Sequence, residues 1–134
     1  MNKMNKKMEY ALMALNLIAM KPPEQLTSAK EVAEKIHISF EMTARVLQAL
    51  SARGLLRAEY GMGGGYALAR PLSQVSLHDL SEMLDGHTLL TKCLEDGESC
   101  ETASTCNIAV PITRLNKKIQ DFYKSISLQE VLHV

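Results

Sequence analysis

The chain has 134 residues, of which 46% are hydrophobic, and this is enough to bury one core without disulfides or a structural metal. The 15 Lys and Arg balance the 15 Asp and Glu, so the net charge neither identifies nor excludes a nucleic-acid binder. Residues 1–70 hold 10 Lys and Arg against 6 Asp and Glu, and residues 71–134 hold 5 against 9, which indicates a basic face in the first half. No apolar run approaches the roughly 20 residues of a membrane span. We therefore expect a soluble protein of one domain with no membrane partner.

Two helices are predicted at the start of the chain. Apolar residues at spacings of three and four predict a first helix over 8–19 that stops before Pro22. Ser28 and Glu31 have the form of a capping box, in which Ser28 accepts a hydrogen bond from a free helix N–H and Glu31 reaches back. This box opens a second helix that ends near Ile36.

A third helix is predicted from Phe40 to Arg53, with Ser39 as its N-cap and Gly54 after its end. Together with the second helix it forms a helix-turn-helix pattern, which also occurs in plain helical cores. A helix fits the major groove of DNA, where Arg45 and Gln48 can pair with guanine and adenine edges. The candidate DNA-contacting residues of this helix pair, most of them on the outward face, are Ser28, Ser39, Phe40, Thr43, Arg45 and Gln48.

A β-hairpin follows the helix pair. Residues 55–60 and 66–70 predict two strands around the glycine-rich segment 61–65. A nucleotide-binding loop is excluded, because Tyr66 stands where the last glycine is needed and no βαβ unit surrounds it. Glycines at a wing tip let backbone N–H groups approach phosphate or a narrow minor groove, and a solvated turn is the alternative. The candidate wing contacts are Arg57, Tyr60 and Gly63.

Ser76 and Asp79 form a second capping box, which opens a fourth helix that runs to Leu84 and stops at Gly86. Residues 87–107 then lose all periodicity. We expect a DNA-binding domain over 1–86, a loop over 87–107, and a separate helical segment over 108–134.

The last segment carries a heptad pattern with apolar residues at spacings of four and three. The residues are Ile108, Ile112, Leu115, Ile119, Phe122 and Ile126. An ordinary helix packed on its own domain is one interpretation. A seam this regular on a terminal helix favours pairing with a second copy. The candidate dimerisation residues are the last five of this pattern, Ile112, Leu115, Ile119, Phe122 and Ile126. Ser127 and Glu130 repeat the capping-box form and predict one last helical turn.

Three cysteines, Cys93, Cys100 and Cys106, lie in the loop, and the chain has no others. An odd number within 14 residues does not describe a disulfide framework and fits a reducing cytoplasm. The wide spacing suits an iron–sulfur cluster better than structural zinc, although zinc, a thiol switch and no role all stay open. A fourth ligand must come from elsewhere. No nucleophile, base and orienting group can be identified, so we expect no enzyme.

The motifs EVAEKIHIS (31–39), LSARGLL (50–56) and GMGGGYALARP (61–71) resemble the Rrf2 family of bacterial transcription regulators, nearly end to end. The resemblance implies a mainly α winged helix-turn-helix homodimer, crossed through a long C-terminal helix, that binds double-stranded DNA at partly palindromic operators. Members with three loop cysteines hold a [2Fe–2S] or [4Fe–4S] cluster, which makes Cys93, Cys100 and Cys106 the expected ligands here.

Two departures from the family pattern concern the fourth ligand and the wing. The histidine that follows the third cysteine in some members is missing, and Glu9 of the partner subunit stands at the place of the carboxylate that serves in others. Tyr60 replaces an arginine that many members carry. Two alternatives remain: a cluster-free regulator that responds to thiol oxidation, zinc or a metabolite, and a dimeric iron–sulfur scaffold that never meets DNA.

Overall fold

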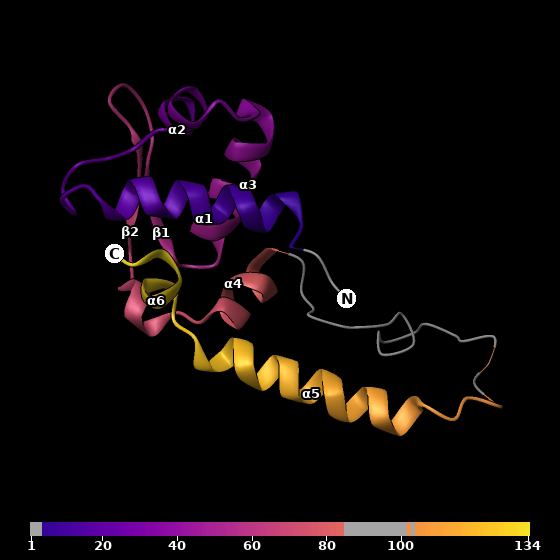
Figure 1. Cartoon of the computed structure of the whole chain (residues 1–134). Coiled ribbons are helices and arrows are strands. Elements are labelled where there is room, and N and C mark those ends of the chain that lie inside the picture. The colour runs from indigo at the N-terminus through magenta and orange to yellow at the C-terminus, as the bar shows by residue number, and fades with distance from the viewer. Residues whose placement is uncertain (1–3, 85–101, 103) are drawn as a thin grey trace.

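A computed structural model of the chain describes residues 4–84, 102 and 104–134, and it confirms a mainly helical fold with a two-stranded hairpin (Figure 1). In order, the elements are α1 (Lys6–Ala19), α2 (Ala29–Ile36), α3 (Phe40–Ala52), β1 (Leu56–Glu59), β2 (Gly65–Leu68), the 3₁₀ turn η1 (Leu72–Gln74), α4 (Leu77–Leu84), α5 (Ala109–Ser125) and α6 (Leu128–Leu132). Within these described residues, no helix combines the length and the apolar character that crossing a membrane requires.

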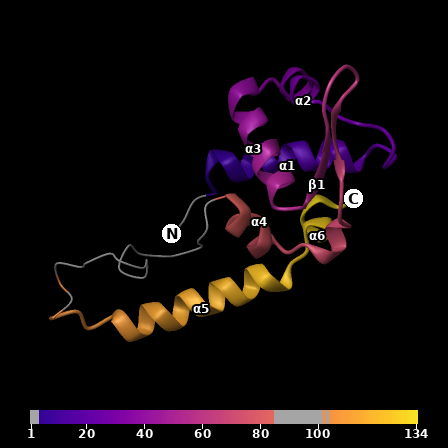
Figure 2. The ribbon, with the colours of Figure 1, turned by 180° about the vertical axis from the view of Figure 1, so that it is seen from behind.

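The hydrophobic core surrounds α1, which packs against α2, α3, α4 and β2. Its largest fully buried side chains come from α1, α3, the residue before β1, α4 and α6: Leu15, Leu47, Leu50, Leu55, Leu80 and Leu128. Figure 1 shows α2, α3 and the hairpin tip on one side of α1, with α4, α5 and α6 on the other, and Figure 2 shows the same division from behind. The helix-turn-helix and the long C-terminal helix therefore lie on opposite sides of the molecule.

Helix α3 starts at Phe40 as the sequence predicts and ends at Ala52, one residue before the predicted end. Ser39 caps it by accepting a hydrogen bond from the Met42 N–H at 3.3 Å. Gly54 follows the C-cap Arg53 with φ of +84°, in the left-handed region that glycine enters freely. The next residue, Leu55, donates its N–H to Leu50 at 3.0 Å and enters the core. The glycine thus ends the helix and directs the chain into the hairpin.

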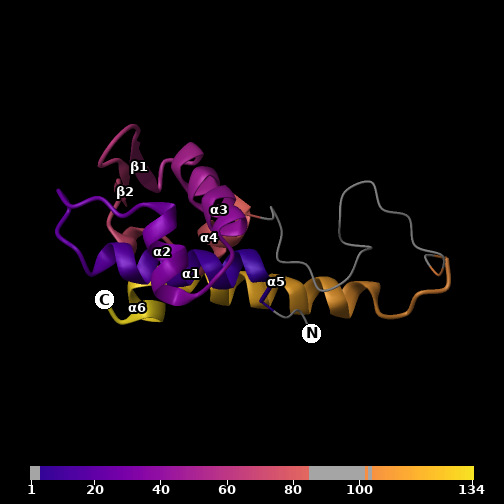
Figure 3. The same cartoon turned by 90° about the horizontal axis from the view of Figure 1, so that it is seen from above.

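The C-terminal segment returns to the core after α5. Backbone hydrogen bonds join Leu77 N to Ile126 O at 2.9 Å and Leu128 N to Val75 O at 2.8 Å. Helix α6, capped by Ser127 as predicted, packs against η1. The base of α5 is therefore tied to the start of α4, while the rest of α5 extends away from the domain (Figure 3).

One of the predicted capping boxes is complete and another is not. Ser76 and Asp79 exchange hydrogen bonds, each 3.0 Å long, at the start of α4. Ser28 accepts from Glu31 N at 3.1 Å. The prediction that Glu31 reaches back to Ser28 is wrong, because its carboxylate binds Lys21 at 2.5 Å and Lys35 at 3.3 Å.

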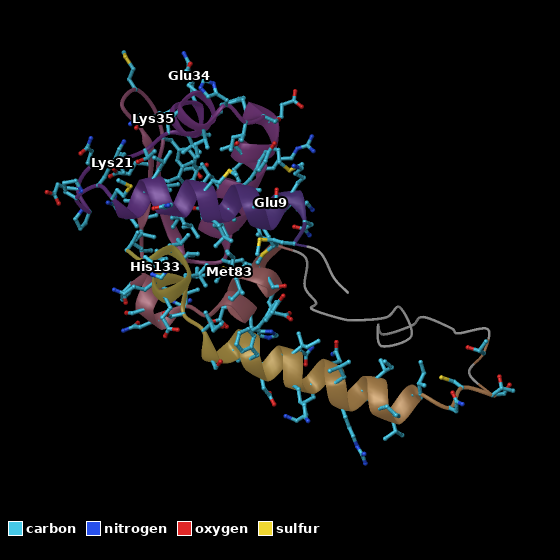
Figure 4. All side chains as sticks on the ribbon, viewed as in Figure 1. Glu9, Lys21, Glu34, Lys35, Met83 and His133 are labelled. Carbon is cyan, nitrogen blue, oxygen red and sulfur yellow. The ribbon has the colours of Figure 1, made fainter. Side chains whose placement is uncertain are left out.

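The Lys21 hydrogen bond holds the pKa of the Glu31 carboxyl below its ordinary value of 4.5, with burial opposing it and Lys35 adding to it. Because the pKa of Glu31 is lower in the folded state, its ionised carboxylate stabilises the fold at every pH above 4.5. This stabilisation is lost as the pH falls through the lowered folded-state pKa. Figure 4 shows Lys21 and Lys35 on the same side of the domain and Glu34 pointing outward.

We expect Glu31→Gln to lower the Tm by about 3 °C at pH 7, because the charge-assisted hydrogen bonds are lost. The difference from the wild type should shrink towards zero on acidification below the folded-state pKa. Thermal unfolding measured from pH 7 to pH ~3 checks this, with Glu34→Gln on the exposed face of the same helix as the control. A Tm difference between the wild type and Glu31→Gln that does not change with pH would show that the ionised Glu31 carboxylate is not its cause.

Candidate nucleic-acid interface

Helix α3 presents one buried and one exposed face. Val46, Leu47 and Leu50 are buried in the core, while Arg45 and Gln48 are exposed. The exposed side chains carry the hydrogen-bonding groups that pair with guanine and adenine in the major groove. Ser39 and Phe40, at the helix start, are exposed as well.

Thr43 lies elsewhere. The prediction that it faces outward is wrong, because its exposed fraction is 1% and its hydroxyl donates to the Ser39 carbonyl at 2.6 Å. The physical reason is its position: Thr43 precedes Val46, Leu47 and Leu50 by three, four and seven residues and so shares their face. Its hydroxyl is satisfied inside the first turn of the helix, and we do not assign it a DNA contact.

The hairpin is a wing whose base is held tightly. Residues Leu56–Glu59 pair antiparallel with Gly65–Leu68, and Tyr66 also exchanges two backbone hydrogen bonds with Thr27, at 2.8 and 3.0 Å. At Gly65, a Cβ would lie 2.7 Å from the Thr27 carbonyl carbon, so only glycine allows this approach. The wing is therefore anchored to the segment that leads into α2.

The wing tip is open to solvent. Tyr60 and Gly63 are exposed, and Met62 is fully exposed between Gly61 and Gly63. Arg57, farther down on β1, forms an ion pair with Glu59 at 3.2 Å. Since both side chains are about half exposed, this pair is weak and Arg57 can exchange it for a phosphate.

Two residues of this region were not identified from the sequence. Thr27 is fully buried and bridges the wing, and the Met62 side chain extends from its tip. The pKa of the Tyr66 phenol is raised, mainly because the side chain is partly buried and secondly because of its electrostatic interaction with Tyr60. Met62 stands between two glycines in the sequence, and this alone could have marked it as a tip residue.

The cysteine loop is described only in part. Cys93 and Cys100 lie outside the described residues, so the arrangement of the three predicted cysteine ligands is not described. Cys106 has a free, half-buried thiol three residues before α5. Glu9 lies in the first turn of α1 and forms an exposed ion pair with Lys6 at 3.5 Å (Figure 4). Among the described residues, no group of three metal-ligating side chains comes together.

Helix α5 divides its heptad pattern into two rows. Leu115 and Phe122 are 48% and 58% exposed, and Ile108, seven residues before Leu115, is exposed too. The second row, Ile112, Ile119 and Ile126, is half-buried. Helix α4 is the main described element that packs against α5. The fold thus covers one side of the seam and leaves an apolar row open.

Comparison with known proteins agrees with this architecture. A model of the Rrf2 family, described as an iron-dependent transcriptional regulator, matches residues 4–134. The transcriptional regulator NsrR of Oceanobacillus iheyensis is 30% identical over 87% of this chain and 78% of its own length.

Solved structures agree as well. CymR, the global cysteine regulator of B. subtilis, is 25% identical with a TM-score of 0.75, covering 99% of this chain and 98% of its own. T. potens IscR is 25% identical with a TM-score of 0.70, covering 98% and 87%. The chain belongs to the Rrf2 family of winged helix-turn-helix transcriptional regulators.

Proposed function

We propose that this chain is a homodimeric regulator that places α3 in the major groove of each half of a partly palindromic operator. The exposure of Arg45 and Gln48, on a helix whose opposite face is buried, carries this proposal. Both side chains lie where the second helix of a helix-turn-helix meets base edges. The wing, anchored at Thr27, holds Tyr60 and Gly63 near the adjacent backbone or minor groove.

Hydroxyl groups at the two helix starts support the phosphate contacts. Ser28 and Ser39 each accept a hydrogen bond from their own helix, and each hydroxyl keeps its proton to donate to a phosphate oxygen. Arg57 adds a positive charge at the wing. Such contacts position the helix, and Arg45 and Gln48 specify the sequence.

Replacing Arg45 with Ala should weaken binding to the operator by about tenfold or more, since a bidentate contact to guanine is lost in each half-site. Fluorescence anisotropy with a selected duplex at several salt concentrations measures this. Arg114→Ala is the control, because Arg114 is an exposed cation on α5, on the other side of α1 (Figure 1). A salt-independent or absent interaction with every duplex would favour the scaffold alternative.

We further propose that an iron–sulfur cluster, [2Fe–2S] or [4Fe–4S], is bound by Cys93, Cys100 and Cys106, with Glu9 of the partner subunit as fourth ligand. The donor set fits, because the Cys106 thiol is free and, in the part of the chain that the structure describes, the Glu9 carboxylate has one ion pair, a weak one at the surface with Lys6. Such a cluster would supply redox-active iron, which is the chemistry that a sensor of iron, oxidants or nitric oxide requires.

The chain's own residues would pass a change at this site to the DNA. Cys106 leads directly into α5, and α1, which carries Glu9, packs against α3. The two α3 helices of a dimer must be about 34 Å apart to enter successive major grooves. A contact between α1 of one copy and the cysteine loop of the other would therefore control the separation of the two α3 helices, and with it the affinity for the operator.

A second candidate, cluster-free thiol sensing, rests on the free Cys106 and on the similarity to CymR, a cysteine regulator. Iron and sulfide assays on protein purified without oxygen distinguish the two. We expect equal amounts of iron and sulfide in the wild type and their loss, with the visible absorption, in Cys106→Ala. The neighbouring Ser104→Ala is the control and should retain both. A colourless wild type that cannot be reconstituted would leave thiols, zinc or a metabolite as the signal.

A further inference from the structure

Phe40 is an exposed aromatic residue at the first position of α3. Its exposed fraction is 54%, and it does not belong to the hydrophobic core cluster. The other large apolar side chains of this helix are buried or packed against that cluster. Packing among the residues that the structure describes therefore gives no reason for a phenyl ring at this position.

The first turn of α3 holds Phe40 in a fixed place. The Ser39 hydroxyl accepts from Met42 N at 3.3 Å, and the Ser39 carbonyl accepts from the Thr43 hydroxyl at 2.6 Å. Phe40 and Gln48 are eight residues apart and, with Ala44 between them, form one row along the helix. The ring thus lies in the same row as the side chain to which we assign an adenine contact, two helical turns nearer the start of the helix, which enters the groove first.

We propose that Phe40 contacts the C5-methyl group of a thymine in each half-site and so determines specificity at that base pair. This inference rests on the proposed function. A phenyl ring has no hydrogen-bonding group, and the thymine methyl is the apolar feature that the major groove offers. Burying one methyl against the ring gives about fourfold in affinity per half-site, or about 15-fold for two independent half-sites.

The test uses the full-length dimer and an operator selected from random duplexes. Each thymine in turn is replaced with deoxyuridine, which lacks the methyl but keeps the O4 acceptor and the pairing. We expect one position per half-site where this lowers wild-type affinity about fourfold. In Phe40→Ala the same replacement should change nothing, whereas Gln48→Ala, the matched control, should keep the preference for thymine.

Three outcomes are distinguishable. If the wild type selects no sequence, the proposed function itself fails. If it selects an operator but binds deoxyuridine as well as thymine at every position, the inference about Phe40 is overturned and DNA binding stands. A preference for thymine that survives in Phe40→Ala overturns it equally. The deoxyuridine scan of the wild type requires no folded variant.

Discussion

Replacing Phe122 with Glu should separate the proposed homodimer into monomers and lower operator affinity by about 100-fold to 10,000-fold, since two linked half-site contacts become independent ones. Phe122 is 58% exposed and lies seven residues after Leu115 in the open row of α5. If two copies pair through this row, each copy of the Phe122→Glu variant buries a carboxylate in an apolar seam without a partner of opposite charge, which is unfavourable. Sedimentation and operator binding measure the two effects.

Arg114→Glu provides the control for Phe122→Glu. It introduces the same carboxylate on the same helix at an exposed position outside the heptad row. We expect this protein to stay dimeric and to bind the operator like the wild type. A Phe122→Glu protein that sediments as a dimer at micromolar concentration would show that α5 does not pair through this row.

Replacing Gly65 with Ala should lower the Tm by about 10 °C, which corresponds to about 2–3 kcal/mol of unfolding free energy. The new Cβ would lie 2.7, 2.8 and 2.9 Å from backbone atoms of Thr27 and Ser28, so one of the two segments must move. That movement breaks the hydrogen bonds between Thr27 and Tyr66 and releases the wing. Operator affinity should fall with it.

Gly63→Ala separates this clash from backbone strain. Gly63 also has a positive φ, of +75°, but nothing lies within 4 Å of the Cβ that it would gain. We expect a loss of only about 1 kcal/mol from strain. Calorimetry on both variants measures the difference, and equal losses would mean that the packing against Thr27 is unimportant.

Local signals in the sequence predicted the elements of the fold well. Ser39, Gly54 and the pair Ser76 and Asp79 each act within a few residues, so their roles can be inferred from spacing alone. The error at Thr43 was also local. Its spacing to the buried residues of α3 places it inward, and a threonine hydroxyl can bond to its own helix.

Contacts between distant segments could not be predicted. Lys21, ten residues away in the sequence, donates a hydrogen bond to the Glu31 carboxylate. Thr27 forms an antiparallel backbone bridge with Tyr66, which is distant in the sequence. The half-covered seam of α5 also depends on where α4 packs, which no periodicity reveals. Of the candidate site, the exposure of Arg45 and Gln48 followed from the helical pattern. The ligand set at Cys93 and Cys100 stays a proposal from the sequence.

The coupling between the cysteine loop and DNA binding is tested most directly by operator affinity before and after iron removal. The protein is purified without oxygen, assayed for iron and sulfide, and titrated with the operator in both states. We expect Kd to change by about 5-fold to 150-fold, the usual range of coupling between two sites, with Cys93→Ala matching the iron-free value. An iron-containing protein with the same Kd in both states would show that the cluster does not control DNA binding.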